Sequence, residues 1–462
     1  MITLLFVSCR PEGDLPNTPN IIIFLVDDLG WTDLSSYGSD FYETPNIDKL
    51  AKQGIKFTNA YSASTVCSPT RAAIMSGKYP ARLQLTDWIT GSINEYAKLK
   101  VPDWKMYLPQ EEETVADFLK DMGYATAHIG KWHLGEDTSY YPLRQGFDIN
   151  VAGYNKGAPP SYFYPYQREG ASTIPYLDGG HEGEYLTDRL TDEAIAFIKS
   201  KQDQPFFLNF NHYAVHTPIQ AHDSVTDYYR RKLMPGMQHN NPAYAAMIHS
   251  TDQSLGKIMA TLDSLKLTED SYVFFASDNG GLVLWDITNN APLRSGKGSP
   301  YEGGTRVPMI IKPAGSYMEG ITTNEPVISM DIFATIRDVL SEESQPDYQD
   351  GLSLKPLLVG ESPSLSRDAL YWHYPHYHRG GASPHSTIRK GKYKLIHYYE
   401  NDSLELYHLG NDIGESKNLA SEQNELAYEM LEELKEWRQA ILAQKPSTNL
   451  NYDSIRSLDY YP

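Results

Sequence analysis

The amino-acid sequence predicts an α/β fold, in which helices flank a large, mostly parallel sheet. Short, almost continuous apolar runs of strand length recur along the first two thirds of the chain, and amphipathic stretches of helical length lie between them. A chain of 462 residues with 40% hydrophobic residues is also long enough to bury a large core. We expect buried parallel strands at residues 21–26, 124–129, 205–210, 272–276 and 307–311.

The expected helices alternate with these strands along the chain. Their apolar residues recur at helical spacing, so that one face of each helix can cover the sheet. Strands that alternate with helices build parallel sheets, and ligands of such folds bind beyond the carboxyl ends of the strands. The expected helices comprise residues 45–53, 114–122, 185–200 and 244–265.

After about residue 350 the pattern changes. The segments SRDALYWHYP, STIRKGKYKLIHYY and LELYHL alternate like antiparallel strands. A final helix is expected at residues 427–444, and the polar, tyrosine-bearing tail at 445–462 is expected to wrap the surface. We therefore divide the chain into an N-terminal tail at 1–18, a large domain at 19–350 and a smaller C-terminal subdomain with an antiparallel sheet at 351–462.

Residues 1–18 resemble the end of a bacterial lipoprotein signal. An apolar stretch from Leu4 to Val7 ends in Ser8 and Cys9, and Cys9 would be the lipidated residue. A frayed tail is the alternative, because the apolar stretch is short and no basic segment precedes it. The signal implies export to the periplasm or the outer membrane of a Gram-negative bacterium. A lipid anchor at Cys9 would be the only membrane attachment, because no apolar run approaches the roughly 18 residues of a membrane span.

The composition restricts the class of partner and the use of cysteine. A formal net charge of −19 argues against nucleic-acid binding, and it means that a site for an anion would need cations clustered locally. The chain has only two cysteines, Cys9 and Cys67, so we expect no disulfide framework.

Polar residues follow four of the expected parallel strands. Carboxylates and an amide, without clustered cysteine or histidine, are ligands that suit a hard cation such as Ca²⁺ or Mg²⁺. The alternative is that these Asp and Asn residues only cap helices or turns. The residues at the strand ends are Asp27 and Asp28, Lys131 and His133, His212 and His216, and Asp278 and Asn279.

The segment VCSPTRAAIMSG raises the question of what Cys67 does. Pro69 suits the first turn of a helix, which places Cys67 at the helix N-terminus, where free N–H groups favour negative charge. Arg71 lies one turn later on the same face. Cys67 could instead be a buried apolar side chain, or a thiolate nucleophile as in phosphotyrosine phosphatases. Those phosphatases place the arginine six residues after the cysteine, which this chain does not.

Five motifs together resemble the sulfatase family. The residues from Cys67 to Arg71 match its C-x-P-x-R maturation signature, and GKWHLG (130–135), HTP (216–218), SDNGG (277–281) and GKGSPYEGGTRVP (296–308) follow in order. The resemblance runs from about residue 19 to 442. One departure is Ser76-Gly77-Lys78, where many sulfatases have Thr-Gly-Arg; this change is conservative.

The resemblance implies an alkaline phosphatase-like sandwich and a modified cysteine. In sulfatases a separate maturase oxidises the motif cysteine to Cα-formylglycine, and the hydrate of this aldehyde is the nucleophile. One hydroxyl would attack sulfur, and deprotonation of the second would then expel sulfate, which an ordinary serine or cysteine ester cannot do. One Ca²⁺ ion would be bound by Asp27, Asp28, Asp278, Asn279 and the formylglycine made from Cys67.

The same resemblance assigns roles to the basic residues. Arg71, Lys131 and Lys297 would hold the hydrate or the sulfate, because positioned positive charge stabilises a transferring sulfate group. His133 would assist the hydrate. Either His216 or Lys297 would protonate the leaving alcohol, which matters because a sugar alkoxide is a poor leaving group.

The substrate implied by the resemblance is a sulfated carbohydrate, with exo action on sulfated galactose or N-acetylgalactosamine as the most specific expectation. Aromatic and polar loops at 85–91, 152–167 and 371–381 are candidates to bind it, because aromatic faces stack on sugars. Packing between the subdomains is the alternative use of these aromatic residues. The candidate substrate contacts are Asp87, Trp88, His212, His373, His376 and Arg379.

Two other functions compete with a sulfatase. A phosphoesterase or phosphonate hydrolase of the same superfamily is the first alternative, but alkaline phosphatases carry a second metal site, and here Lys131 and Lys297 take its place. A non-catalytic glycan-binding protein is the other alternative. It is disfavoured because all catalytic positions of the motifs are intact.

Overall fold

The computed structural model describes residues 18–315, 318–341, 346 and 348–461. Its centre is an eight-stranded sheet in the order β10-β2-β9-β8-β1-β7-β5-β6. The five neighbouring strands from β8 to β6 are parallel. The strands are β1 (Asn20–Val26), β2 (Ile55–Phe57), β5 (Ala125–Gly130), β6 (Ile149–Val151), β7 (Phe206–Asn211), β8 (Ser271–Ser277), β9 (Met309–Lys312) and β10 (Ile321–Thr323).

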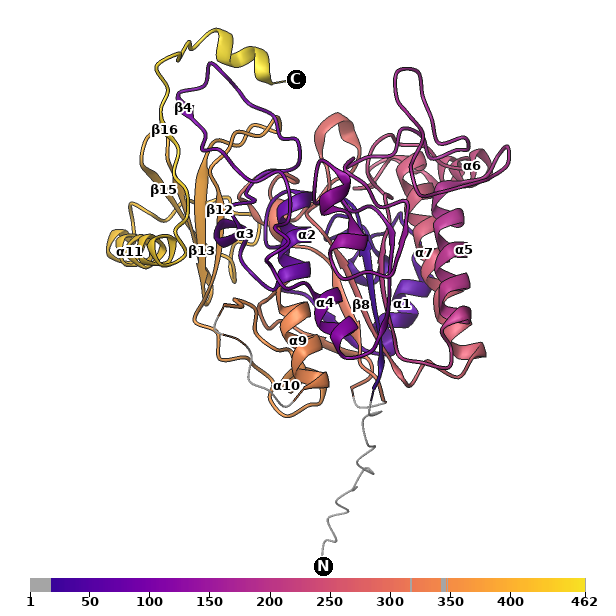
Figure 1. Ribbon diagram of the computed structural model, residues 1–462. Coiled ribbons are helices and arrows are strands. Elements are labelled where there is room, and N and C mark those ends of the chain that lie inside the picture. Colours follow the sequence, from indigo (N-terminus) through magenta and orange to yellow (C-terminus); the bar gives the residue numbers. More distant parts are fainter. Residues whose placement is uncertain (1–17, 316–317, 342–345, 347, 462) are drawn as a thin grey trace, which may run out of the picture.

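Helices cover both faces of this sheet. Figure 1 shows α1 (Pro45–Lys52), α5 (Leu186–Ser200) and α7 (Pro242–Ser264) on one side of β8. On the other side lie α2 (Cys67–Ser76), α4 (Val115–Asp121) and α9 (Asp331–Leu340). This is the α/β sandwich that the sequence predicts.

The central strand β1 is covered on both faces, which explains why polar residues do not alternate with apolar ones in its sequence. Every residue of β1 is buried. Ile22, Phe24 and Val26 belong to one apolar cluster, and the intervening Ile21, Ile23 and Leu25 belong to the cluster on the opposite face. A strand covered on both faces must be apolar at every position.

Local signals define the helix starts within a residue or two of their expected positions. Pro45 and Pro242 occupy the first turns of α1 and α7, where a missing N–H costs nothing. Thr114 forms a capping box with Asp117 at the start of α4.

One expectation about strand direction is wrong. The run at 307–311 forms β9, which is antiparallel to both β8 and β2 rather than parallel. Its apolar character reports burial on both faces, and burial does not distinguish strand direction.

The C-terminal region forms the expected antiparallel sheet, with strand order β12-β13-β14-β15. The strands are β12 (Ala369–Tyr374), β13 (His385–Lys390), β14 (Tyr393–Tyr398) and β15 (Ser403–His408). Helix α11 (Asn424–Ala440) packs Ala427, Met430, Leu431 and Leu434 on this sheet and begins and ends slightly earlier than expected. The domain boundary at residue 350 stays a prediction.

Buried charges join the C-terminal sheet to the large domain. Glu302 accepts a hydrogen bond from Tyr61 Oη at 2.7 Å and pairs with Lys394 Nζ at 3.0 Å. Lys394 also pairs with Glu415 at 3.0 Å. Since Glu302 begins α8 (Glu302–Thr305), this network fixes the loop that carries Lys297 just before it.

The tail beyond α11 runs along the surface, as expected. Its strand β16 (Ser447–Thr448) pairs with β4 (Leu99–Lys100). None of the described helices is long and apolar enough to cross a membrane. Residues 1–17, including Cys9, lie outside the described residues. The remaining α-helices and strands of the described residues are β3 (Ala60–Tyr61), α3 (Pro80–Leu83), α6 (Asp223–Lys232), β11 (Val327–Ile328) and α10 (Lys355–Leu358).

Candidate active site

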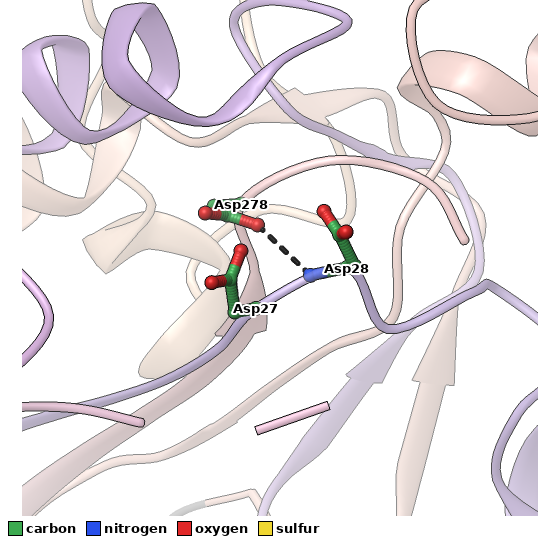
Figure 2. A group of neighbouring side chains, drawn as sticks. All are labelled: Asp27, Asp28 and Asp278. Carbon is green, nitrogen blue, oxygen red and sulfur yellow. Dashed lines mark hydrogen bonds between the residues drawn. The ribbon is translucent and has the colours of Figure 1, made fainter. Parts of the chain in front are cut away.

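Three carboxylates meet at the carboxyl edge of the sheet. Asp27 and Asp28 follow β1, and Asp278 follows its neighbour β8. Oxygen atoms of the three lie within 4.8 Å of one another, and Figure 2 shows the side chains gathered at the two strand ends. Asp28 adopts a left-handed backbone conformation (φ 60°), and its amide donates to Asp278 Oδ1 at 3.2 Å.

The donor set fits a hard cation. Asp27 Oδ1, Asp28 Oδ2 and Asn279 Oδ1 are buried and have no hydrogen-bond partner in the described structure. Unpaired buried acceptors are costly, and a divalent cation bound by oxygen would satisfy them together. Asp27, Asp28, Asp278 and Asn279 are therefore the residues that would hold Ca²⁺ or Mg²⁺.

Three cationic side chains surround the carboxylates. Arg71 donates through Nε to Asp278 Oδ2 at 2.8 Å and through Nη1 to the carbonyl of Lys131 at 3.0 Å. Lys131 Nζ lies 2.6 Å from Asp27 Oδ2, and Lys297 Nζ lies 2.6 Å from Asp28 Oδ1. The six formal charges cancel, so a bound divalent cation would leave the site positive and suited to an anion.

The electrostatic balance differs among the three acids. Burial raises the pKa of Asp28, but Lys297 and His216 outweigh it and hold this pKa far below its usual range. At Asp278 burial is likewise the largest single cause, but Arg71, Lys131 and Lys297 together outweigh it and lower the pKa. Burial and the neighbouring Asp278 raise the pKa of Asp27, and Lys131 offsets only part of this effect. A bound cation would stabilise the charged form of Asp27.

Cys67 is the first residue of α2 and faces this cluster. The whole helix is buried, and Cys67 itself is 3% exposed. Burial raises the pKa of its thiol, with Lys131 and Lys297 offsetting part of the rise. The site therefore disfavours the thiolate nucleophile that was the alternative for this residue.

His133 lies between Cys67 and the loop that follows α3. Its Nδ1 is 3.4 Å from Cys67 Sγ, and its Nε2 contacts the carbonyl of Ile89. Burial and Lys131 lower the pKa of His133, so the ring is neutral near pH 7. Gly130, at the end of β5, permits the close approach to β7 just before this histidine: its φ is +103°, and a Cβ there would lie 1.9 Å from the carbonyl oxygen of Asn211 on β7.

His216 approaches the cluster from the loop after β7. Its Nε2 lies 3.6 Å from Asp28 Oδ2, and its Nδ1 lies 2.9 Å from the carbonyl of Thr217. Burial lowers the pKa of His216 to about 4, although Asp28 opposes this shift.

A pocket of about 430 Å³ opens above these residues. Cys67, His133, His216 and Lys297 line it, so the nucleophile position and three candidate catalytic groups face one space. The volume is in the range of small-molecule sites.

Only two of the six candidate substrate residues line this pocket, namely Trp88 and Arg379. The assignment of the other four as direct sugar contacts is not supported, because each is buried against protein. His212 packs on Phe24 and Phe210 and bonds Ser254, and Asp87 accepts from Tyr374 Oη at 2.8 Å. His373 bonds Ser386, and His376 bonds Thr86.

Several pocket residues are missed by sequence reasoning. His378 lies in the candidate loop at 371–381 without a pattern that singles it out, and Asn155 and Lys156 lie in the candidate loop at 152–167. The aromatic residues of that second loop, such as Tyr162 and Tyr166, are in the core instead. The sequence gives no indication that Trp285 and Tyr460 line the pocket, because neither lies in a motif.

Comparison with known proteins adds independent information. Residues 19–341 match the family model described as Sulfatase, and residues 296–440 match that described as N-sulphoglucosamine sulphohydrolase, C-terminal. A sulfatase from Formosa agariphila is 33% identical over 95% of this chain and 92% of its own length. The N-acetylgalactosamine-6-sulfatase of Homo sapiens is 31% identical over 88% of this chain and 76% of its own length.

A solved structure extends this similarity to three dimensions. The crystal structure of Ps i-CgsB in complex with k-i-k-neocarrahexaose has a TM-score of 0.77 and 28% sequence identity. The match covers 96% of this chain and 97% of that chain, so it includes both the large domain and the C-terminal sheet.

Proposed function

Because this chain belongs to the sulfatase family and is a sulfuric ester hydrolase, we propose that it hydrolyses sulfate esters of carbohydrates with a nucleophile made from Cys67. One observation carries the proposal. Cys67 lines a pocket from the N-terminus of α2, and three cationic side chains pair with the acids beside it. A sulfate ester is an anion, and these three side chains supply positive charge locally in a strongly acidic chain.

Cys67 would act after oxidation to Cα-formylglycine by a separate maturase. The hydrate of this aldehyde carries two hydroxyl groups on one carbon: the first attacks sulfur, and deprotonation of the second releases sulfate and restores the aldehyde. Neutral His133, 3.4 Å from the position-67 side chain, is suited to take that proton.

Asp27, Asp28, Asp278, Asn279 and the modified residue 67 would hold one Ca²⁺ ion. When bound, the ion would make a hydrate hydroxyl more acidic and offset charge on the sulfate oxygens. Arg71 orients Asp278, and Lys131 orients Asp27, so that these carboxylates stay in place during the reaction. Lys297 faces the pocket and would contact the sulfate directly.

The leaving alcohol needs a proton from His216 or Lys297, both of which line the pocket. Lys297 carries a proton at neutral pH, since burial lowers its pKa but Asp28, together with Cys67, Asp27 and Asp278, outweighs burial and raises it. His216 is mostly neutral at rest, and it would act as the acid only if the bound sulfate raises its pKa.

The proposed substrate is a sulfated galactose or N-acetylgalactosamine unit at the end of a saccharide, so that the enzyme acts in exo fashion. The relative that acts on N-acetylgalactosamine 6-sulfate and the structure that holds neocarrahexaose support this class. The pocket volume also suits one terminal sugar with its sulfate.

We also propose export and lipid attachment at Cys9, which detergent partitioning of wild type and Cys9→Ala would test.

The test is a screen of defined sulfated saccharides that measures free sulfate, with protein produced together with a maturase. We expect the wild-type protein to release sulfate from at least one sulfated galactose or N-acetylgalactosamine derivative, and Cys67→Ala to release none. The intact mass of the modified wild-type protein should be about 18 Da below that of the unmodified chain. Faster cleavage of phosphate or phosphonate esters than of any sulfate ester would instead favour the phosphoesterase alternative. Glycan binding without turnover of any ester by modified protein would favour the binding protein.

A further inference from the structure

A second cavity of about 510 Å³ adjoins the catalytic pocket. The two share five lining residues, which makes them parts of one continuous groove. The shared residues are Ser92, Leu284, Trp285, Arg379 and Tyr460.

The cavity is assembled from segments far apart in the sequence. The loop at 92–96 forms one wall, and the C-terminal tail around Arg456 and Tyr460 forms another. Asn449 ties the tail to this loop by donating to the carbonyls of Glu95 at 2.9 Å and Ala97 at 2.7 Å. The hydroxyl of Tyr460 donates to the carbonyls of Ser92 and Tyr377. These bonds hold the wall in position before any ligand binds.

An indole ring stands at the junction of the two cavities. Trp285 is 70% exposed and adopts a left-handed conformation (φ 56°), which is unfavourable for a bulky residue. Strained residues with exposed aromatic side chains are concentrated at ligand sites, and an indole face stacks well on a sugar ring. Its position at the junction suits a sugar that leaves the catalytic pocket.

Two arginines face the same groove. Arg456 stacks on the Tyr96 ring with its guanidinium carbon 3.4 Å from the ring centroid, and Arg379 lies 5.8 Å from the Tyr460 centroid. No ion pair of 4.0 Å or less joins either arginine to a carboxylate among the described residues, although Glu95 and Asp459 also line the cavity and Asp453 accepts a hydrogen bond from the Arg456 amide at 3.1 Å. The Arg456 guanidinium also donates through Nη2 to the Tyr96 hydroxyl. Planar guanidinium groups bind sulfate and carboxylate through paired hydrogen bonds.

We propose that this cavity is a second sugar subsite, which binds the neighbouring unit of an oligosaccharide and recognises an anionic group on it through Arg456. The proposal rests on the proposed function and narrows its substrate class to saccharides with a sulfate or carboxylate on the sugar next to the one cleaved. Arg456 is a specificity-determining residue in this scheme, because it lies outside the catalytic pocket.

The experiment compares wild type, Arg456→Gln, Arg456→Lys and the control Arg231→Gln, an exposed arginine on α6 away from both cavities. The substrates are a monosaccharide sulfate and three disaccharides whose second sugar is neutral, sulfated or a uronic acid. We expect Arg456→Gln to lower kcat/KM about five- to tenfold on the sulfated or uronate disaccharide, mainly through KM. The monosaccharide and the neutral disaccharide should change less than twofold, and Arg456→Lys should recover part of the loss.

Equal effects of Arg456→Gln on all four substrates, or no effect on any, would overturn the subsite. Whichever of the sulfated and uronate disaccharides responds identifies the anion. Calorimetric binding of the same disaccharides to Cys67→Ala protein tests the subsite without turnover. Weaker binding of the anionic disaccharide by Cys67→Ala/Arg456→Gln supports it even if sulfate release fails, whereas unchanged binding overturns it.

Discussion

Replacement of Lys297 by alanine tests whether its positive charge stabilises the sulfate group during hydrolysis. Its ammonium lies 2.6 Å from Asp28 Oδ1, is mostly buried and faces the pocket. The change removes one positioned positive charge where the sulfate oxygens would lie. Loss of one such stabilising group costs about 2.7–4 kcal/mol, so kcat should fall about 10²–10³-fold. Loss of a mostly buried pair also destabilises by about 3–5 kcal/mol, less if a bound cation compensates Asp28.

The assay is initial-rate sulfate release on the best saccharide from the screen, at several pH values. Intact mass must show that Cys67 is modified to the same extent in variant and wild type, and circular dichroism must show the native fold. Lys297→Arg keeps the charge and serves as the matched control, with a smaller loss. Activity of modified, folded Lys297→Ala within threefold of wild type would refute the role of this residue.

Four further outcomes are expected. Cys67→Ala should fold with unchanged thermal stability but release no sulfate, and protein made without a maturase should be nearly inactive; measurable turnover by Cys67→Ala would contradict the nucleophile assignment. Prolonged EGTA treatment should lower both activity and melting temperature, because the buried acceptors Asp27 Oδ1, Asp28 Oδ2 and Asn279 Oδ1 are then left without a ligand, and Ca²⁺ should restore both. Arg71→Lys keeps the charge but loses the paired Nε and Nη2 contacts to Asp278, which should lower the free energy of unfolding in urea by about 2–3 kcal/mol. An unchanged urea midpoint would argue against this role. Burial lowers the pKa of His212 and His373 to about 3 from 6.5, so the unfolded chain binds protons that the folded chain does not as pH falls below 6.5. The contribution of these two histidines to stability should therefore be complete above pH 6.5 and be lost toward pH 3, so that the stability of His212→Asn declines less steeply than that of wild type; equal slopes would show that His212 does not contribute.

Much of the candidate site follows from the order of residue types along the chain. Asp27, Asp28, Asp278 and Asn279 follow apolar strands, and the parallel order brings those strand ends together. Pro69 predicts that Cys67 lies at a helix N-terminus, and Cys67 is the first residue of α2. These inferences succeed because they depend on local signals and on one rule of parallel sheets.

The histidines show where local signals fail. His212 follows the same strand as His216, yet its ring lies among Phe24, Phe210 and Ser254 while His216 faces the acids. His376 and His378 are two residues apart, and only His378 lines the pocket. Nothing in the residue types distinguishes the members of these pairs, because side-chain direction depends on how each loop packs.

The sequence by itself determined the fold class, the acids at the strand ends and the position of Cys67 at a helix N-terminus, since each depends on short-range pattern. Only the tertiary structure decided that β9 runs antiparallel and that Tyr460 reaches the pocket from the end of the chain. Apolar periodicity reports that a residue is buried or exposed, but not which distant segment lies beside it. The groove walls are made by such distant segments, and their positions follow from long-range packing alone.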